Sequence, residues 1–121
     1  MRALNIVVAT ADAERLRGAL MLAAAQAALG GAASIFLQLD AVALLRAPIA
    51  APHDSAHRAA GLPDLAALLD DALELGVILI ACQSGLALCG MTAADLPTGV
   101  ETGGPVGFLQ TTDDQARLLF A

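Results

Sequence analysis

The sequence has no lysine, tryptophan or tyrosine, and its 121 residues include only two cysteines. The absence of lysine excludes Schiff-base chemistry and a lysine-dependent phosphate loop. With 2% aromatic residues and a net charge of −6, the chain offers neither rings on which bases could stack nor positive charge for a phosphate backbone. We therefore expect no nucleic-acid partner.

Long apolar stretches without charge are also scarce. The longest, residues 18–39, matches a membrane span in length, but it is mostly alanine, and the pair Gly30-Gly31 divides it into a helix-like half and a strand-like half. No signal-peptide pattern is present at the N-terminus. We expect a cytoplasmic protein with no membrane partner, in which both cysteines remain thiols.

What the chain does contain is alanine. The hydrophobic fraction is 58%, and 29 residues are alanine, which contributes little hydrophobicity per residue. This composition predicts a closely packed core of small side chains. The length predicts a single domain over residues 1–121.

Strand and helix patterns alternate along the chain. Strands are predicted at 4–9, 33–39 and 77–81, with shorter ones near Val100 and at 117–120. Helices are predicted at 13–29 and 64–75, with shorter ones at 40–46, at 84–90 with the Ser84 hydroxyl as its cap, and from about Pro105. Segment 47–63 holds three of the five prolines and both histidines and is predicted to be a long loop.

The pattern is clearest in the helix at 64–75. One face is predicted to be core and carries Leu65, Leu68, Leu69, Ala72 and Leu73, while the other carries Asp70, Asp71 and Glu74 and is predicted to be exposed.

This alternation predicts an α/β fold: a flavodoxin-like three-layer sandwich with a four- or five-stranded, mostly parallel sheet and strand 77–81 at its centre. The dinucleotide-binding form is disfavoured, because "ATADAER" follows the first strand where G-x-G-x-x-G would be needed. We expect no cofactor.

The segment "GVILIACQSGLALCG" at 76–90 runs from a strand into Cys82. Ligands collect at the carboxyl ends of parallel strands, and the amide N–H groups of a following helix favour thiolate over thiol. Cys82 is therefore the candidate nucleophile, with Gln83 and Ser84 beside it and with Thr10 and Gln38, near the ends of the first two strands, as candidate binding residues. A free cysteine is also often a small buried hydrophobe, so a packing role for Cys82 stays open.

Two other groups are weaker candidates. Cys89 lies seven residues after Cys82, about 10 Å along a helix and beyond disulfide reach, so we expect it to be a packing residue. His53 and His57 are spaced to share a helix face and could bind a metal, but no third ligand is evident and Pro52 favours a loop. We expect no metal site.

Three segments together resemble the DsrE/DsrF-like proteins, small flavodoxin-like α/β domains involved in sulfur relay: "LNIVVATADAERLRGALMLAAAQAALG", "LAALLDDALELG" and "GVILIACQSGL". The resemblance spans nearly the whole chain. It implies that Cys82 matches the family's sulfur-carrying cysteine, which accepts sulfane sulfur as a persulfide and hands it to a partner's thiol. It also implies homo-oligomers, often trimers or hexamers, with the cysteine near a subunit boundary, and a protein that donates or accepts sulfur.

The sequence departs from what a sulfur carrier needs in one respect. No basic residue lies between Arg58 and Arg117 to stabilise a persulfide anion, so the helix N-terminus has to suffice unless Arg15, Arg46 or a neighbouring subunit reaches the site. Two functions follow: a sulfur carrier or sulfurtransferase-like protein that uses Cys82, or a non-catalytic module for small-ligand binding or assembly.

Overall fold

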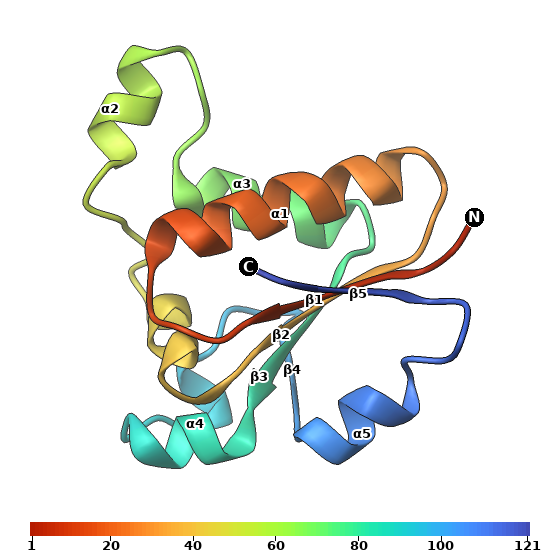
Figure 1. Ribbon diagram of the computed structural model, residues 1–121. Helices are drawn as coiled ribbons and strands as arrows, with labels where there is room; N and C mark the ends of the chain where they lie inside the picture. Colours follow the sequence, from red (N-terminus) through yellow and green to blue (C-terminus); the bar gives the residue numbers. More distant parts are fainter.

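The computed structural model describes residues 1–121 and shows five parallel strands in one sheet, in the order β4-β3-β2-β1-β5 (Figure 1). The strands are β1 Leu4–Val8, β2 Ala33–Leu37, β3 Ile78–Cys82, β4 Glu101–Gly103 and β5 Arg117–Phe120. The predicted flavodoxin-like α/β class is confirmed. The third strand is not central as predicted, because β4 and β5 join opposite edges and leave β2 in the middle.

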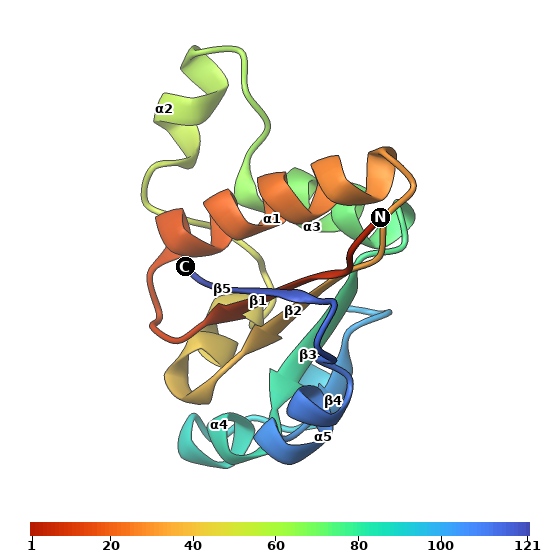
Figure 2. The same ribbon diagram turned by 45° about the vertical axis from the view of Figure 1, so that its right-hand side comes forward.

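Helices cover both faces of this sheet. Figures 1 and 2 show α1 and α3 on one face, α4 and α5 on the other, and α2 standing away from the sheet beyond α1. The helices are α1 Ala13–Ala28, α2 Asp54–Ala59, α3 Leu65–Glu74, α4 Gln83–Leu88 and α5 Pro105–Gln110, with short 3₁₀ segments η1 Leu39–Leu45 and η2 Ala93–Asp95. None of the helices is both long and apolar enough to cross a membrane.

Helix α1 forms as its sequence predicts. The Asp12 carboxylate caps its start by accepting a hydrogen bond from the Glu14 N–H at 2.9 Å. Gly30, at a φ of +89°, takes the left-handed conformation that ends the helix. Between these ends a stripe of leucine and alanine is buried against the sheet: Leu16, Ala19, Leu20 and Ala23.

Helix α3 confirms the predicted exposure of Asp70 and Glu74 but buries a narrower stripe than predicted. Leu65, Leu69 and Ala72 are buried, whereas Leu68 and Leu73 are only half-buried. At about 100° per residue, these last two lie at the margins of the stripe, so they reach the core with only part of the side chain.

Segment 47–63 is not the continuous loop that was predicted, because α2 forms within it at Asp54–Ala59. Pro52 does not prevent this, since the helix begins two residues after it. Helix α2 has no apolar stripe that a sequence pattern could reveal; Asp54 is its only buried residue.

The remaining connections differ from prediction by one or two residues. Helix α4 begins at Gln83 and ends at Leu88, so Ser84 lies inside its first turn and is not the cap. Cys82 takes the N-cap position, and no side chain caps this helix. The short turn η2 was not predicted; a capping box between Thr92 and Asp95 stabilises it.

Candidate functional site

Cys82 is the last residue of β3 and lies directly before α4. It pairs with Gly103 of β4, and the register that pairs Ala81 with Leu37 of β2 makes Gln38 its neighbour on the other side. Because the pleat alternates side chains between the two faces, Cys82 and Gln38 point to the same face as Phe36. That face is the α5 face, since the Phe36 ring stacks on Phe108 of α5 with centroids 5.0 Å apart.

The Cys82 side chain is buried, with 2% of its surface exposed. Its place at the carboxyl end of the sheet therefore does not expose it to solvent. Helix α4, which begins directly after the thiol, approaches η1 closely: a Cβ added to Gly85 would overlap the carbonyl oxygen of Leu39. Only glycine allows this contact, which packs α4 against η1.

The predicted binding residues separate into two groups. Gln83 and Ser84 follow Cys82 immediately and are exposed. Gln38 is half-buried and lines a cavity of about 120 Å³ together with Phe36 and Phe108. Gln38, Gln83 and Ser84 therefore all lie next to Cys82, the first on the adjacent strand and the other two along the chain.

Thr10 lies farther away. It is exposed beyond the end of β1, where its carbonyl accepts a hydrogen bond from the Asp12 N–H at 2.8 Å. Strand β1 is two strands from β3 in the sheet, which is about 10 Å at the usual spacing. Thr10 therefore belongs to the start of α1 and not to the surroundings of Cys82.

The arginines considered as anion partners are engaged elsewhere. Arg46 donates a hydrogen bond from Nη2 to the carbonyl of Cys89 at 2.8 Å, at the C-terminal end of α4. Arg15 lies 3.8 Å from the Asp12 carboxylate, at the start of α1. Neither arginine pairs with Cys82, and the amide N–H groups of the first turn of α4 lie directly after it as possible donors to an anion.

Both cysteines are free thiols. Cys89 is half-buried and packs against the core, as expected for a packing residue. His57 lies on α2 and its Nε2 is 3.1 Å from the Glu14 carboxylate. No group of three or more histidine, cysteine, aspartate or glutamate side chains is placed to hold a metal ion.

Sequence patterns did not predict the buried ion pair between α1 and α2. Arg17 donates from Nη2 to Asp54 at 2.9 Å, and both side chains are almost fully buried. Asp54 also accepts hydrogen bonds from the N–H groups of Ala51 and Leu65 at 2.8 and 3.0 Å. The Arg17–Asp54 bond holds α2 against α1, and the bond from the Leu65 N–H ties Asp54 to the start of α3, which is a structural role.

These contacts shift the titration of two carboxylates. The hydrogen bond from Arg17, opposed in part by burial, lowers the pKa of Asp54 from its ordinary 3.8 to about 2. The hydrogen bond with His57 is the largest cause that lowers the pKa of Glu14, and Arg17, 3.1 Å from Glu14, lowers it further. Both carboxylates are held in the charged form at neutral pH.

Comparison with known proteins completes the description. A family model described as the DsrE/DsrF-like family matches residues 1–120. The fold is similar to the crystal structure of the ychN protein from E. coli (TM-score 0.80, 22% identity, 100% of both chains). It is also similar to MTH1491 from Methanobacterium thermoautotrophicum (TM-score 0.68, 17% identity, 100% of both chains).

A third similar structure is BT1422 from Bacteroides thetaiotaomicron (TM-score 0.71, 16% identity, 98% of this chain and 94% of that one). At these identities the solved structures show a shared fold alone. No curated protein matches the sequence.

Proposed function

The chain belongs to the DsrE/DsrF-like family, and on that premise we propose that it is a sulfur carrier or sulfurtransferase-like protein. In this proposal Cys82 accepts sulfane sulfur as a persulfide and passes it to the thiol of a partner. The supporting observation is the position of a free thiol at the carboxyl end of β3, directly before the first turn of α4. In parallel α/β sheets, reacting groups collect at this end.

The transfer needs no external oxidant or reductant. The Cys82 thiolate attacks the terminal sulfur of a donor persulfide, so the new S–S bond forms as the donor's S–S bond breaks, and the donor leaves as a thiol. An acceptor thiolate then attacks the same terminal sulfur, and Cys82 is released as the thiol. The amide N–H groups of Gln83 and Ser84 lie in the first turn of α4, where helical hydrogen bonding leaves them free to stabilise the persulfide anion.

The burial of Cys82 sets a condition on this function. The terminal sulfur of a persulfide lies about 2 Å beyond the cysteine sulfur, and a donor must reach that point in line with the S–S bond. Transfer therefore requires a local opening of the segment that covers the thiol. Helix α4 has six residues, of which only Gly85 and Leu86 are buried, so it can open at low cost compared with the long helices.

Partners follow from the same proposal. A sulfur relay needs a protein or small persulfide that donates to Cys82 and a thiol that accepts from it. We also propose that the chain forms homo-oligomers, trimers or hexamers by family resemblance. The cytoplasmic location expected from the sequence stays a prediction.

A second function, a non-catalytic module for small-ligand binding or assembly, is favoured by one observation: Cys82 is buried like a core residue. The cavity beside Gln38 is small for a ligand site, about 120 Å³ against the roughly 300–1,000 Å³ usual for such sites. Under this alternative Cys82 only packs, and its replacement by serine affects stability alone.

Persulfide loading separates the two functions. The native protein is incubated with inorganic polysulfide, freed of excess reagent and weighed intact. Under the sulfur-carrier function, wild type and Cys89→Ser each gain about one sulfur, roughly 32 Da, that dithiothreitol removes. Cys82→Ser gains none.

Cys89→Ser is the matched control, because Cys89 is the more exposed of the two thiols. Equal loading of both cysteines, or loading that survives the loss of Cys82, would leave the binding or assembly module as the better function.

A further inference from the structure

The two edge strands of the sheet are protected very differently. Strand β4 has three residues, and Glu101 and Thr102 lie exposed on it. A short, charged edge is the usual defence of a sheet against pairing with another chain. Strand β5 has one charged residue, Arg117, whose Nη2 donates to the Gln26 side chain at 3.0 Å and is thereby held to α1. The rest of β5 is Leu118, Leu119 and Phe120, all exposed.

Strand β5 also has free backbone groups at its outer edge. The N–H groups of Arg117 and Ala121 donate to Ala3 and Val7, at 2.8 and 2.9 Å. In a parallel pair, the N–H and C=O of one residue both point to the neighbouring strand, and those of the next residue both point to the opposite side. The N–H and C=O groups of Leu118 and Phe120 therefore point away from β1. The outer edge therefore offers two donors and two acceptors that no neighbouring strand uses.

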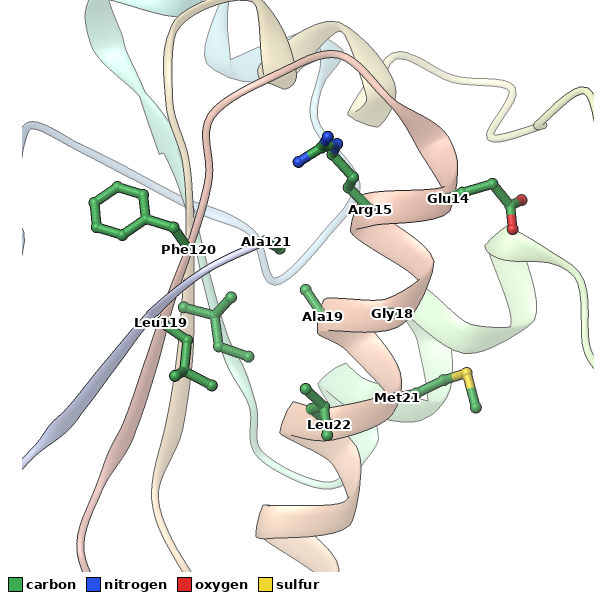
Figure 3. Close-up of a pocket in the computed structure, with 10 residues that line it drawn as sticks. Glu14, Arg15, Gly18, Ala19, Met21, Leu22, Leu119, Phe120 and Ala121 are labelled. Atoms are coloured by element: carbon green, nitrogen blue, oxygen red, sulfur yellow. The ribbon is translucent and has the colours of Figure 1, made fainter.

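Apolar side chains flank this edge on both faces of the sheet. Figure 3 shows Leu22 of α1 and Leu119 of β5 pointing toward the same space, a cavity of about 530 Å³, while Phe120 projects from the side of β5 away from α1. On that second face Phe120 lies near Leu109 of α5, which lines the same small cavity.

The β5 edge patch, defined as Leu22, Leu109, Leu118, Leu119 and Phe120, exposes on the order of 500 Å² of apolar surface. Each partner in a standard protein interface buries about 800 Å². The patch therefore supplies more than half of the area that one partner contributes to such an interface.

We propose that a second copy of this chain pairs with the β5 edge, antiparallel and about a twofold axis at Leu119. This register places Leu118 opposite the partner's Phe120 and Leu119 opposite the partner's Leu119. About four backbone hydrogen bonds form between the free groups of Leu118 and Phe120 and those of the second copy. The patch is self-complementary in this arrangement, since aliphatic and aromatic residues meet across the strands on the α5 face and leucines meet on the α1 face.

The result is one continuous sheet of two chains. The proposal does not depend on the chemistry of Cys82, and a twofold contact of this kind joins two trimers into a hexamer if a separate threefold contact is present.

Sedimentation velocity tests the surface. Wild type should form dimers, or an even multiple, at micromolar concentration. Phe120→Lys should weaken this association at least tenfold, because it places a charge in the apolar contact. Leu88→Lys, a matched change at an exposed leucine on α4, should leave it within twofold.

Leu118→Pro tests the backbone contact by removing an outward N–H while leaving the hydrogen bonds to β1 in place, and it should also weaken association. Circular dichroism checks that each variant is folded.

Cross-linking tests the register. In the proposed pairing, Leu119 and its symmetry mate form a non-hydrogen-bonded pair with Cα atoms about 4.5 Å apart, within disulfide range. Leu119→Cys in a Cys89→Ser background should therefore oxidise to a covalent dimer, whereas Leu88→Cys in the same background should not.

Three results would each overturn the proposal. A wild type that stays monomeric at 100 µM would leave a strand of another protein as the occupant of the edge, and a Phe120→Lys variant that associates like wild type would assign self-association to another surface. A dimer in which Leu119→Cys does not cross-link would exclude the proposed register.

Discussion

The two helical layers that cover the sheet differ in size and in what they bury. On one face, α1 and α3 have 16 and 10 residues and bury leucines along their length. On the other, α4 and α5 have six residues each and bury only Gly85, Leu86 and Phe108. Burial of large apolar side chains is the main source of stability, so the first layer holds the fold together. The second layer lies on the face to which Cys82 points, and its low burial suits it to local opening.

Loss of a leucine in the long-helix layer should have the largest effect on stability. Leu69→Ala removes a side chain with 2% exposure and should lower the free energy of unfolding by about 2 to 5 kcal/mol. Urea denaturation measures this loss. Leu68→Ala, one position earlier but half-buried, should cost clearly less; equal losses would mean that the two positions share one environment.

In the short-helix layer an added methyl group should be destabilising. Gly85→Ala places a Cβ 2.1 Å from the backbone oxygen of Leu39, so α4 or η1 must move. We expect a loss of about 1 to 3 kcal/mol, as for overpacking elsewhere.

The same displacement should uncover the thiol. Cys82 in Gly85→Ala should react with iodoacetamide faster than in wild type, as followed by mass spectrometry. An unchanged rate would show that the contact between α4 and η1 does not control access to Cys82.

The same substitution in the long-helix layer should have the opposite sign. Gly18 lies within α1, and an added Cβ there meets nothing within 4 Å. Gly18→Ala should therefore raise the free energy of unfolding by about 0.5 to 1 kcal/mol through helix propensity. Thermal melting of Gly18→Ala beside Gly85→Ala measures both signs in one experiment, and a destabilised Gly18→Ala would remove the contrast between the layers.

The smallest expected effect is the pH dependence of the contact between α2 and the long-helix layer, which should be absent near neutral pH. The pKa of Asp54 is about 2 when folded and 3.8 ordinarily, so its ion pair with Arg17 contributes stability above about pH 4 and loses it as the pH falls toward 2. The lowered pKa values of Glu14 and Asp64 act in the same direction.

Hydrogen exchange of residues 54–59 should therefore be unchanged between pH 7 and 5, after correction for the intrinsic rate, and faster than expected below about pH 4. In Asp54→Asn this acid-dependent step should be much reduced; a wild-type acid response in that variant would assign the step to other carboxylates.

How far the sequence predicts this structure depends on where the stabilising contacts lie. Helix α1 and strand β5 were predicted within a residue, because caps and apolar patterns are local signals. Helix α2 was missed, since its one buried anchor, Asp54, pairs with an arginine 37 positions earlier in the chain. No pattern within a short window carries that information.

The candidate site shows the same limit. The strand that leads into Cys82 was evident from the sequence, and so was the proximity of Gln83 and Ser84. The burial of Cys82 was not, because it depends on how distant segments pack around the end of β3, and the close approach of Gly85 to Leu39 leaves no local signal in the sequence. The pattern at 117–120 predicted a strand but did not predict that its side chains are exposed at an edge.

The pairing of β1 with β5 also affects how the protein is made. These are the first and last strands of the chain, and the N–H of Arg117 reaches back to the carbonyl of Ala3. During synthesis β1 is made long before residues 117–120, so any sheet that forms without β5 has β1 as its edge. The five buried residues of β1, "LNIVV", are then open to chaperones and to other nascent chains until translation of the last segment supplies their neighbour.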